Sequence, residues 1–210
     1  MEQWTNPSLE VCRGRSIIIG LSGGIACYKM GWVVSALAQA EAQVTVLMTE
    51  AATRFISPLT FQALTGRPVY TDQWTHVESQ DPQHVSLARS AELMLLAPCT
   101  MDMLGRLATG RTDDVVSLVT AGVDRTKQPV LLAPSMNEVM WNQPATQRNV
   151  GLLREDGFGV LAPGSGWQAC RSVGVGRLPE PPQLLQCVVE ALRDRPEIPA
   201  PGPEQPQWTD

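Results

Sequence analysis

Short apolar runs alternate with amphipathic helical stretches along this chain, and this alternation constrains its fold more than any other feature. The first run, residues 16–20, reads S-I-I-I-G and is followed at once by L-S-G-G. Apolar residues then recur at helical spacing over residues 25–39, and a second run, Q-V-T-V-L-M, occupies residues 43–48. Runs without polar alternation are typical of buried parallel strands, so the first fifty residues predict a β–α–β unit with a right-handed crossover.

The same alternation continues to residue 193. The predicted strands and helices that follow are strands 92–97, 129–133 and 159–162 and helices 100–108, 114–122, 145–156 and 182–193. This order predicts a single doubly wound α/β domain, a Rossmann-like open parallel sheet with helices on both faces. We expect this domain at residues 16–195, an N-terminal extension at 1–15, and a disordered tail at 196–210, where five of fifteen residues are proline.

Composition narrows the class of ligand. Lys and Arg total 16 against 21 Asp and Glu, a net charge of −5, which argues against nucleic-acid and anionic-membrane partners. The five cysteines form no C-x-x-C pair and have only two histidines beside them, which argues against a disulfide framework or a metal site. The first fifteen residues are polar and no stretch reaches the length of a membrane span, so we expect a cytoplasmic protein with a small-molecule ligand.

Ligands of open α/β sheets bind beyond the carboxyl ends of the strands, so the loops there are the candidate site. The first loop, residues 20–29, reads G-L-S-G-G-I-A-C-Y-K. Gly20, Ser22, Gly23 and Gly24 could hold a phosphate against a helix N-terminus, although the spacing fits neither a dinucleotide fingerprint nor a P-loop. A tight turn without a ligand remains the alternative.

Three further segments carry candidate polar groups. Thr49 ends the second strand, and Ser57 followed by proline predicts a capped helix start. The segment A-P-C-T-M-D, residues 97–102, follows the third strand and would line the ligand edge. His84, in H-V-S-L, and His76 are the two histidines available as proton carriers, although a lone histidine is often structural. Residues 71–83 are polar and predict a surface loop.

The two most informative segments lie in the C-terminal half. P-S-M-N-E-V-M-W, residues 134–141, places Asn137 directly after a strand, either as a helix cap or as an amide that contacts a ligand. Residues 163–181 are rich in glycine and predict a mobile lid around Cys170. We expect that thiol, beside Arg171, to be more exposed and ionisable than Cys27 and Cys187, with an unreactive loop cysteine as the alternative.

Together these segments, from residue 16 to 181, resemble the flavin-containing cysteine decarboxylase family. Residues 134–141 match the family motif P-x-M-N-x-x-M-W at every fixed position, and residues 20–29 resemble its FMN-phosphate loop. H-V-S-L resembles its active-site histidine motif, and A-C-R-S-V-G-V-G-R-L-P-E-P resembles its substrate clamp. F-I-S-P-L-T-F-Q-A-L-T-G, residues 55–66, is similar to the decarboxylase half of bacterial bifunctional coenzyme A biosynthesis proteins.

The resemblance implies a flavoprotein fold and FMN-dependent decarboxylation of 4′-phosphopantothenoylcysteine to 4′-phosphopantetheine. FMN would oxidise the cysteine moiety to a thioaldehyde, which loses CO₂ as an enethiol that is then reduced again. Asn137 would hold the substrate carboxylate, His84 would move a proton or hold the substrate, and Cys170 would protonate the enethiol. The resemblance also implies trimers or dodecamers with FMN at subunit contacts, and a separate phosphopantothenoylcysteine synthetase that supplies the substrate.

The contact residues that this resemblance implies form two groups. Those for FMN are Gly20, Ser22, Gly23, Gly24, Thr49, Ser57, Thr60, Pro98, Cys99 and Thr100. Those for the substrate are Asn137, Met136, Met140, Ala169 and Arg171. The sequence departs from the family where A-P-C-T-M-D replaces the usual A-P-A-T-A-N, and where Arg171 replaces the glycine after the clamp cysteine.

Three other functions compete with this reading. A relative that oxidatively decarboxylates the C-terminal cysteine of a peptide would stop at the enethiol and would not need Cys170. A flavoprotein that regulates a partner without turnover would be expected to carry a more acidic tail than residues 196–210. A flavin prenyltransferase of similar fold would lack the asparagine motif that this chain contains.

Overall fold

The computed structural model describes residues 7–74 and 82–193. His76 and the proline-rich segment 196–210 lie outside these ranges. A six-stranded parallel sheet forms the centre, with the strand order β3-β2-β1-β4-β5-β6. Its strands are β1 (Ser16–Leu21), β2 (Gln43–Met48), β3 (Val69–Tyr70), β4 (Leu93–Cys99), β5 (Val130–Pro134) and β6 (Gly159–Val160). This order and the helices on both faces confirm the predicted doubly wound, Rossmann-like sheet.

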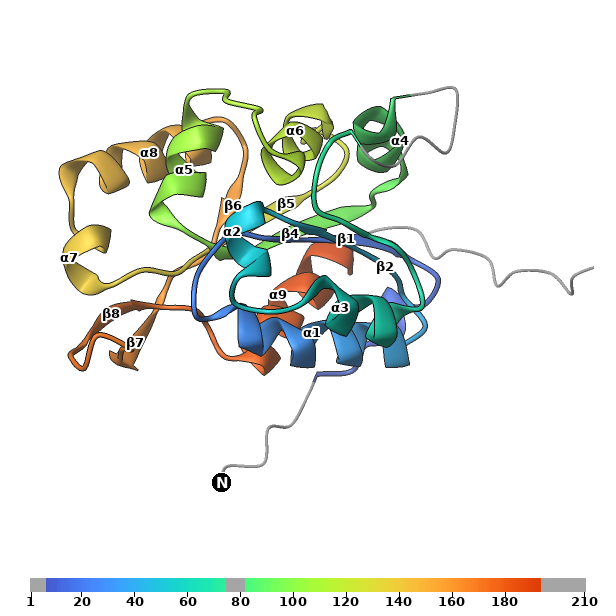
Figure 1. Cartoon of the computed structure of the whole chain (residues 1–210), viewed down its shortest axis with the longest axis horizontal. Coiled ribbons are helices and arrows are strands. Elements are labelled where there is room, and N and C mark those ends of the chain that lie inside the picture. Colours follow the sequence, from blue (N-terminus) through green and yellow to red (C-terminus); the bar gives the residue numbers. More distant parts are fainter. Residues whose placement is uncertain (1–6, 75–81, 194–210) are drawn as a thin grey trace, which may run out of the picture.

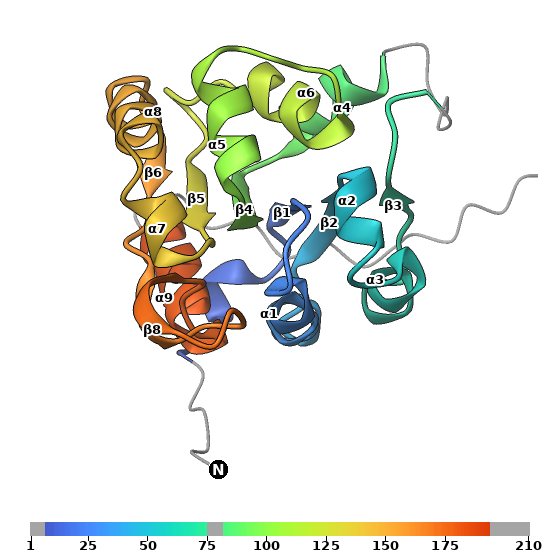
Figure 2. The ribbon, with the colours of Figure 1, turned by 60° about the vertical axis from the view of Figure 1, so that its left-hand side comes forward.

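Helices cover both faces of the sheet (Figure 1). One face carries α1 (Cys27–Gln39), α3 (Pro58–Thr65) and α9 (Pro181–Leu192), and the opposite face carries α4 (Gln83–Ser90), α5 (Met101–Ala108), α6 (Val115–Gly122) and α8 (Pro144–Glu155). Figure 2 shows the same two layers from another side. The short helices α2 (Glu50–Thr53) and α7 (Glu138–Trp141) follow β2 and β5 at the carboxyl edge of the sheet.

Side chains of the central strands divide between two cores. Ile17 and Ile19 pack under α1 and α9, whereas Ile18, between them, packs with the apolar side chains of α5 and α6. Because successive side chains of a strand point to opposite faces, a strand covered on both sides must be apolar throughout. This requirement explains the uninterrupted apolar runs of β1, β4 and β5.

The residues before β1 are also packed. A single 3-10 turn, η1 (Glu10–Cys12), places the Cys12 side chain in the core beneath α9, fully buried. Arg15 is almost fully buried and forms an ion pair with Glu92 at 2.8 Å. No helix of residues 7–74 or 82–193 is long and apolar enough to cross a membrane.

The glycine-rich segment 163–181, for which the sequence predicted no strands, contains two of them. Most of this segment forms an antiparallel hairpin of β7 (Gly164–Trp167) and β8 (Val173–Arg177), set beside α7 (Figure 1). Its glycines serve close packing, since Gly176 has a φ of 131° and a Cβ there would lie 2.3 Å from the Met136 carbonyl oxygen. The strand β3 and helix α4 were also not predicted, because both adjoin the polar stretch at residues 71–83.

Candidate functional site

A cavity of about 1670 Å³ lies at the carboxyl edge of the sheet. Its walls come from the loops after β1, β2, β4 and β5 and from the hairpin β7–β8. The chain leaves β1 toward β2 on one side and returns to β4 on the other, so the cavity lies at the point where the strand order reverses. Ligands of doubly wound sheets bind in this crevice, which agrees with the location predicted from the sequence.

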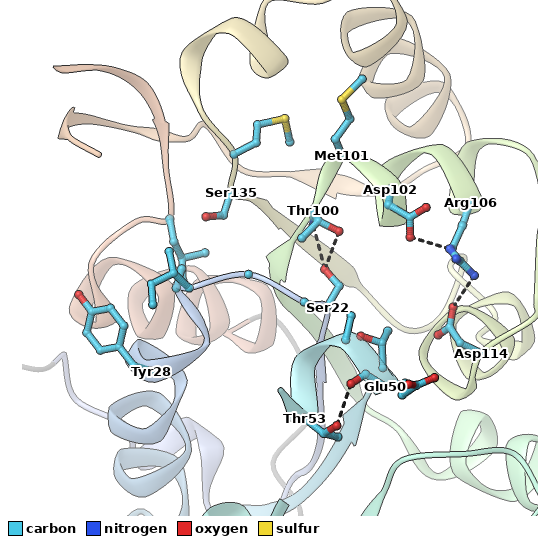
Figure 3. Close-up of a pocket in the computed structure, with 18 of the residues that line it drawn as sticks. Ser22, Tyr28, Glu50, Thr53, Thr100, Met101, Asp102, Arg106, Asp114 and Ser135 are labelled. Atoms are coloured by element: carbon cyan, nitrogen blue, oxygen red, sulfur yellow. Dashed lines mark hydrogen bonds and ion pairs between the residues drawn. The ribbon is translucent and has the colours of Figure 1, made fainter. Parts of the chain in front are cut away.

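Two hydroxyl side chains join the first and third loops at the base of this cavity. Ser22 Oγ donates to the Pro98 carbonyl oxygen at 2.8 Å and accepts a hydrogen bond from the Thr100 backbone N–H at 2.9 Å. Figure 3 shows Ser22 and Thr100 facing each other. These bonds connect the loops after β1 and β4, so the buried Ser22 side chain fixes their relative position.

The glycine loop presents backbone rather than side chains to the cavity. A Cβ on Gly23 would lie 2.4 Å from the Ala51 Cβ, so only glycine allows the loops after β1 and β2 to approach this closely. Within the described part of the chain, no acceptor takes the backbone N–H groups of Gly23, Gly24 or Ile25. They stand ahead of α1, a helix of 13 residues whose N-cap offers no side-chain oxygen. Free N–H groups at a helix N-terminus suit an anionic ligand.

Several of the predicted polar residues are helix caps at the cavity edge. Thr49 Oγ1 accepts from Ala52 N–H, and Thr100 Oγ1 accepts from Met103 N–H. Asn137 Oδ1 accepts from Met140 N–H at 2.8 Å, so the amide caps α7. Among the described residues nothing accepts from Asn137 Nδ2, so the same amide can still donate to a ligand. The two interpretations of Asn137 are therefore compatible.

Cys170 lies in the turn of the hairpin and is exposed. Its Sγ lies 3.0 Å from Ser172 Oγ, and this hydrogen bond lowers the pKa of the thiol below its ordinary value. Burial raises the pKa of Cys27 and of Cys99, and Cys187 is half-buried with a raised pKa for the same reason. The expectation that Cys170 is the exposed, ionisable cysteine of the three compared is confirmed.

A network of charged side chains from α5 and the loop after it lines another part of the cavity. Arg106 donates to Asp102 at 2.7 Å and to Asp114 at 3.3 Å, and also pairs with Asp113 (Figure 3). The hydrogen bond to Asp102 is the main reason why the pKa of Arg106 is raised. Asp102 stands where the resemblance predicts asparagine. Its negative charge is compensated by the guanidinium of Arg106, which lies four residues further along α5.

The cavity brings together only part of the predicted site. Its lining includes Ser22, Gly23, Gly24, Thr49, Thr100, Met136, Asn137, Met140, Ala169 and Cys170. The lining does not include Gly20, Ser57, Thr60, Pro98, Cys99, Arg171 or His84. Gly20 packs inside the sheet and Cys99 is buried in the core, whereas Ser57 caps α3. His84 lies in the first turn of α4, which packs against α6.

The lining residues that sequence reasoning missed include Lys29, Arg177 and Gln168. Lys29 is almost fully buried, and its Nζ donates to the Leu178 carbonyl oxygen at 3.2 Å and to Glu180 at 2.8 Å. Arg177 shares the same Glu180 oxygen at 2.9 Å. Gln168 is buried beside Cys170. A lysine on the apolar face of a predicted helix was the one signal that the sequence offered for Lys29.

A crevice of this kind, with a glycine loop before a helix at the switch point of a 3-2-1-4-5-6 sheet, is typical of nucleotide-binding α/β proteins. Comparison with known families gives a match to the Flavoprotein model over residues 6–193. The chain belongs to the Flavoprotein family.

Curated relatives include the coenzyme A biosynthesis bifunctional proteins CoaBC. The Bacillus subtilis protein is 39% identical over 188 residues, which cover 90% of this chain and 46% of the relative. The Mycobacterium tuberculosis protein is 44% identical over 170 residues, covering 81% of this chain and 40% of the relative. The chain thus spans less than half the length of these curated relatives.

Solved structures with the same fold include three informative neighbours. A cysteine-to-serine mutant of PPC decarboxylase, complexed with pantothenoylaminoethenethiol, has a TM-score of 0.76 and 28% identity. The matched region covers 84% of this chain and 97% of the decarboxylase chain. The FMN-dependent cysteine decarboxylase SpaF has a TM-score of 0.73 and 27% identity, covering 87% and 97%. The FMN binding protein AtHal3 has a TM-score of 0.74 and 28% identity, covering 84% and 95%.

Proposed function

We propose that this chain is an FMN-dependent decarboxylase that converts 4′-phosphopantothenoylcysteine to 4′-phosphopantetheine in coenzyme A biosynthesis. The observation that carries the proposal is one cavity in which the glycine loop, Asn137 and Cys170 meet. The likeness to CoaBC proteins and to PPC decarboxylase supports this choice of substrate.

The residues of the cavity fit FMN. A volume of about 1670 Å³ exceeds the usual range of small-molecule pockets and leaves room for a flavin mononucleotide together with a substrate. The free N–H groups of Gly23, Gly24 and Ile25 would hold the phosphate group, and the Gly23 contact with Ala51 keeps side chains out of that space. When bound, FMN supplies a two-electron couple that takes electrons from the cysteine moiety and later returns them.

The protein's own residues would position and protonate the substrate. Asn137 Nδ2 would donate to the carboxylate that leaves as CO₂, while Asn137 Oδ1 keeps its bond to α7. After that loss, the thiol proton of Cys170 would move to the carbon that carried the carboxylate. The neighbouring carbon, which bears the sulfur, would take up the returned electron pair together with a second proton, which gives the saturated thiol and leaves Cys170 as a thiolate to be reprotonated by solvent. A depressed pKa makes the Cys170 thiol a better acid for this step.

We further propose that the active unit is a homotrimer or a dodecamer, in which His84 serves the cavity of a neighbouring copy. His84 does not line the cavity of its own chain, and the rim of that cavity carries exposed apolar side chains, among them Tyr28 and Trp167. Exposed apolar groups around a site favour burial by another subunit. The substrate would be supplied by a phosphopantothenoylcysteine synthetase, and the whole reaction takes place in the cytoplasm.

The first test uses the purified protein and its visible spectrum, followed by addition of 4′-phosphopantothenoylcysteine. We expect a flavin spectrum, release of CO₂ and a product with the mass of 4′-phosphopantetheine. A flavin-loaded protein that releases no CO₂ from this substrate would exclude the proposed function.

A second candidate is oxidative decarboxylation of a peptide's C-terminal cysteine. The likeness to SpaF, an FMN-dependent cysteine decarboxylase, leaves room for a cysteine substrate other than 4′-phosphopantothenoylcysteine, since its TM-score and identity are almost those of the PPC decarboxylase comparison. Cys170 at the cavity argues against it, because a reaction that stops at the enethiol needs no such proton donor. Activity on cysteine-terminated peptides that survives Cys170→Ser would favour this second candidate.

A further inference from the structure

Gln168 is a buried amide at the junction of the hairpin and α7. Its side chain is 6% exposed, although it stands at the cavity wall at the end of β7. The Oε1 atom accepts from the Glu138 backbone N–H at 3.3 Å, and Nε2 donates to the Val175 carbonyl oxygen at 3.0 Å. One side chain therefore connects β8 to the residue that directly follows Asn137.

The same residue also closes the turn that carries Cys170. Gln168 Oε1 lies 3.5 Å from Cys170 Sγ and 3.4 Å from Ser172 Oγ. Its backbone N–H donates to the Ser172 carbonyl oxygen at 2.8 Å, and its own carbonyl accepts from the Arg171 N–H at 2.9 Å. Both the side chain and the main chain of Gln168 thus hold the turn.

Only one orientation of this amide satisfies its surroundings. The Glu138 N–H can only donate and the Val175 carbonyl can only accept, which assigns Oε1 and Nε2 without ambiguity. The contact is close on every side, because a Cβ on Gly174 would lie 2.6 Å from a Glu138 carboxylate oxygen, and one on Gly176 would lie 3.3 Å from Gln168 Nε2. Loss of the amide would therefore leave two backbone groups unpaired at a tightly packed junction.

We propose that Gln168 is a positioning residue that holds the Cys170 thiol in fixed relation to Asn137. This inference rests on the proposed function, in which the amide of Asn137 and the thiol of Cys170 act on one substrate. The two groups belong to different elements, and Gln168 bonds both to the residue after Asn137 and to the turn that carries Cys170, beside a second link in which the Glu138 carboxylate accepts from the Val175 N–H at 3.4 Å. A purely structural role for Gln168 would change stability and leave the products of turnover unchanged.

Two substitutions separate the roles of this amide. Gln168→Met keeps the length of the side chain and removes every hydrogen bond that it makes. Gln168→Glu keeps an acceptor for the Glu138 N–H but cannot donate to the Val175 carbonyl. Gln147→Met is the matched control. Gln147 is exposed on α8, and its Nε2 donates to the carbonyl oxygen of Trp141, the last residue of α7, at 2.6 Å. This bond does not involve the hairpin.

The experiment measures CO₂, the ratio of unsaturated to saturated thiol product, and the alkylation rate of Cys170 in substrate-free protein by peptide mapping. The assay is run in air, so that dioxygen can reoxidise flavin that has not returned its electrons. In Gln168→Met we then expect CO₂ release to continue while that ratio rises roughly tenfold or more, since a displacement of about 1 Å can cost a hundredfold in rate. Alkylation of Cys170 should slow, because the turn no longer holds Ser172 against the thiol. Gln168→Glu should show a smaller change in the same direction, and Gln147→Met should match the wild type.

An unchanged product ratio together with an unchanged alkylation rate in the Gln168 variants would overturn the inference, whatever happens to their melting temperatures. If Gln168→Met does not fold, Gln168→Glu decides by the same two criteria. If the wild type releases no CO₂, the proposed function fails, whereas the alkylation comparison still tests whether Gln168 positions the thiol.

Discussion

At the residue scale, Gly23 is the position where a single added carbon should matter most for cofactor binding. A Cβ there would lie 2.4 Å from the Ala51 Cβ and 2.9 Å from its carbonyl carbon, so the loops after β1 and β2 would have to separate. We expect Gly23→Ala to destabilise the protein by about 1–3 kcal/mol and to release most of its FMN during purification. Flavin absorbance per mole of protein and the urea unfolding midpoint are the measurements.

Gly31→Ala is the matched control for that substitution. Gly31 lies inside α1, and a Cβ there meets nothing within 4 Å. This change should keep the flavin and stabilise the fold by about 0.5–1 kcal/mol, because alanine loses less backbone entropy in a helix. Equal flavin loss in both variants would show that the close contact at Gly23 is not what shapes the phosphate site.

A second prediction at this scale concerns the protonation of Cys170. Its hydrogen bond with Ser172 lowers the thiol pKa, so thiolate forms at lower pH than it does in an ordinary cysteine. In the proposed reaction the thiol is the proton donor, so the share of unsaturated product should rise as the pH passes upward through this pKa. Ser172→Ala should raise the pKa and displace both that rise and the alkylation profile of Cys170 to higher pH. Superimposable profiles for the two proteins would contradict the assignment of this hydrogen bond.

At the element scale, Lys29 connects α1 to the segment between the hairpin and α9. The ammonium group is buried and bonds to the Leu178 carbonyl oxygen and to Glu180, which Arg177 also contacts. Lys29→Met would leave that carbonyl unpaired, so we expect a loss of about 1–3 kcal/mol in the free energy of unfolding. Chemical denaturation measures this loss. Arg13→Gln should cost much less than Lys29→Met, because Arg13 and Glu41 form an exposed pair.

Also at the element scale, the sequence predicted the helices and strands in which apolar residues follow a clear pattern. The strands β1, β2, β4 and β5 were predicted from uninterrupted apolar runs. Asn137 was identified as a candidate because its motif directly follows a predicted strand. The hairpin was missed because its glycines alternate with few apolar residues, and the pairing that stabilises it joins residues from 164 to 177. Gln168 carried no local signal, since its partners Glu138 and Val175 come from segments that only the fold brings together.

At the scale of the whole molecule, a single chain brings together most of the residues that we propose to bind FMN, but not all three proposed catalytic residues. Asn137 and Cys170 share one cavity, whereas His84 lies on α4, in the same helix layer as α5 but separated from it by α6. Ile25, in the turn before α1, and Tyr28 and Trp32, on α1, lie three to four residues apart and are more than half exposed. An apolar stripe beside the cavity is the surface that we expect a second copy to cover, and such a contact would bring another chain's residues to this site.

Mixed oligomers test whether the site is shared between copies. His84→Asn and Cys170→Ser should each fail to make saturated product alone, whatever the assembly. If each site combines Cys170 of one copy with His84 of its neighbour, random mixing in equal amounts leaves about one quarter of the sites with both native residues, as in a ring of heterologous contacts. Co-expression of the two variants with different tags, followed by double affinity purification, should therefore restore a comparable fraction of activity. Complete inactivity of a verified mixed oligomer would place His84 and Cys170 of the same chain at one site, and would require α4 to approach the cavity of its own chain.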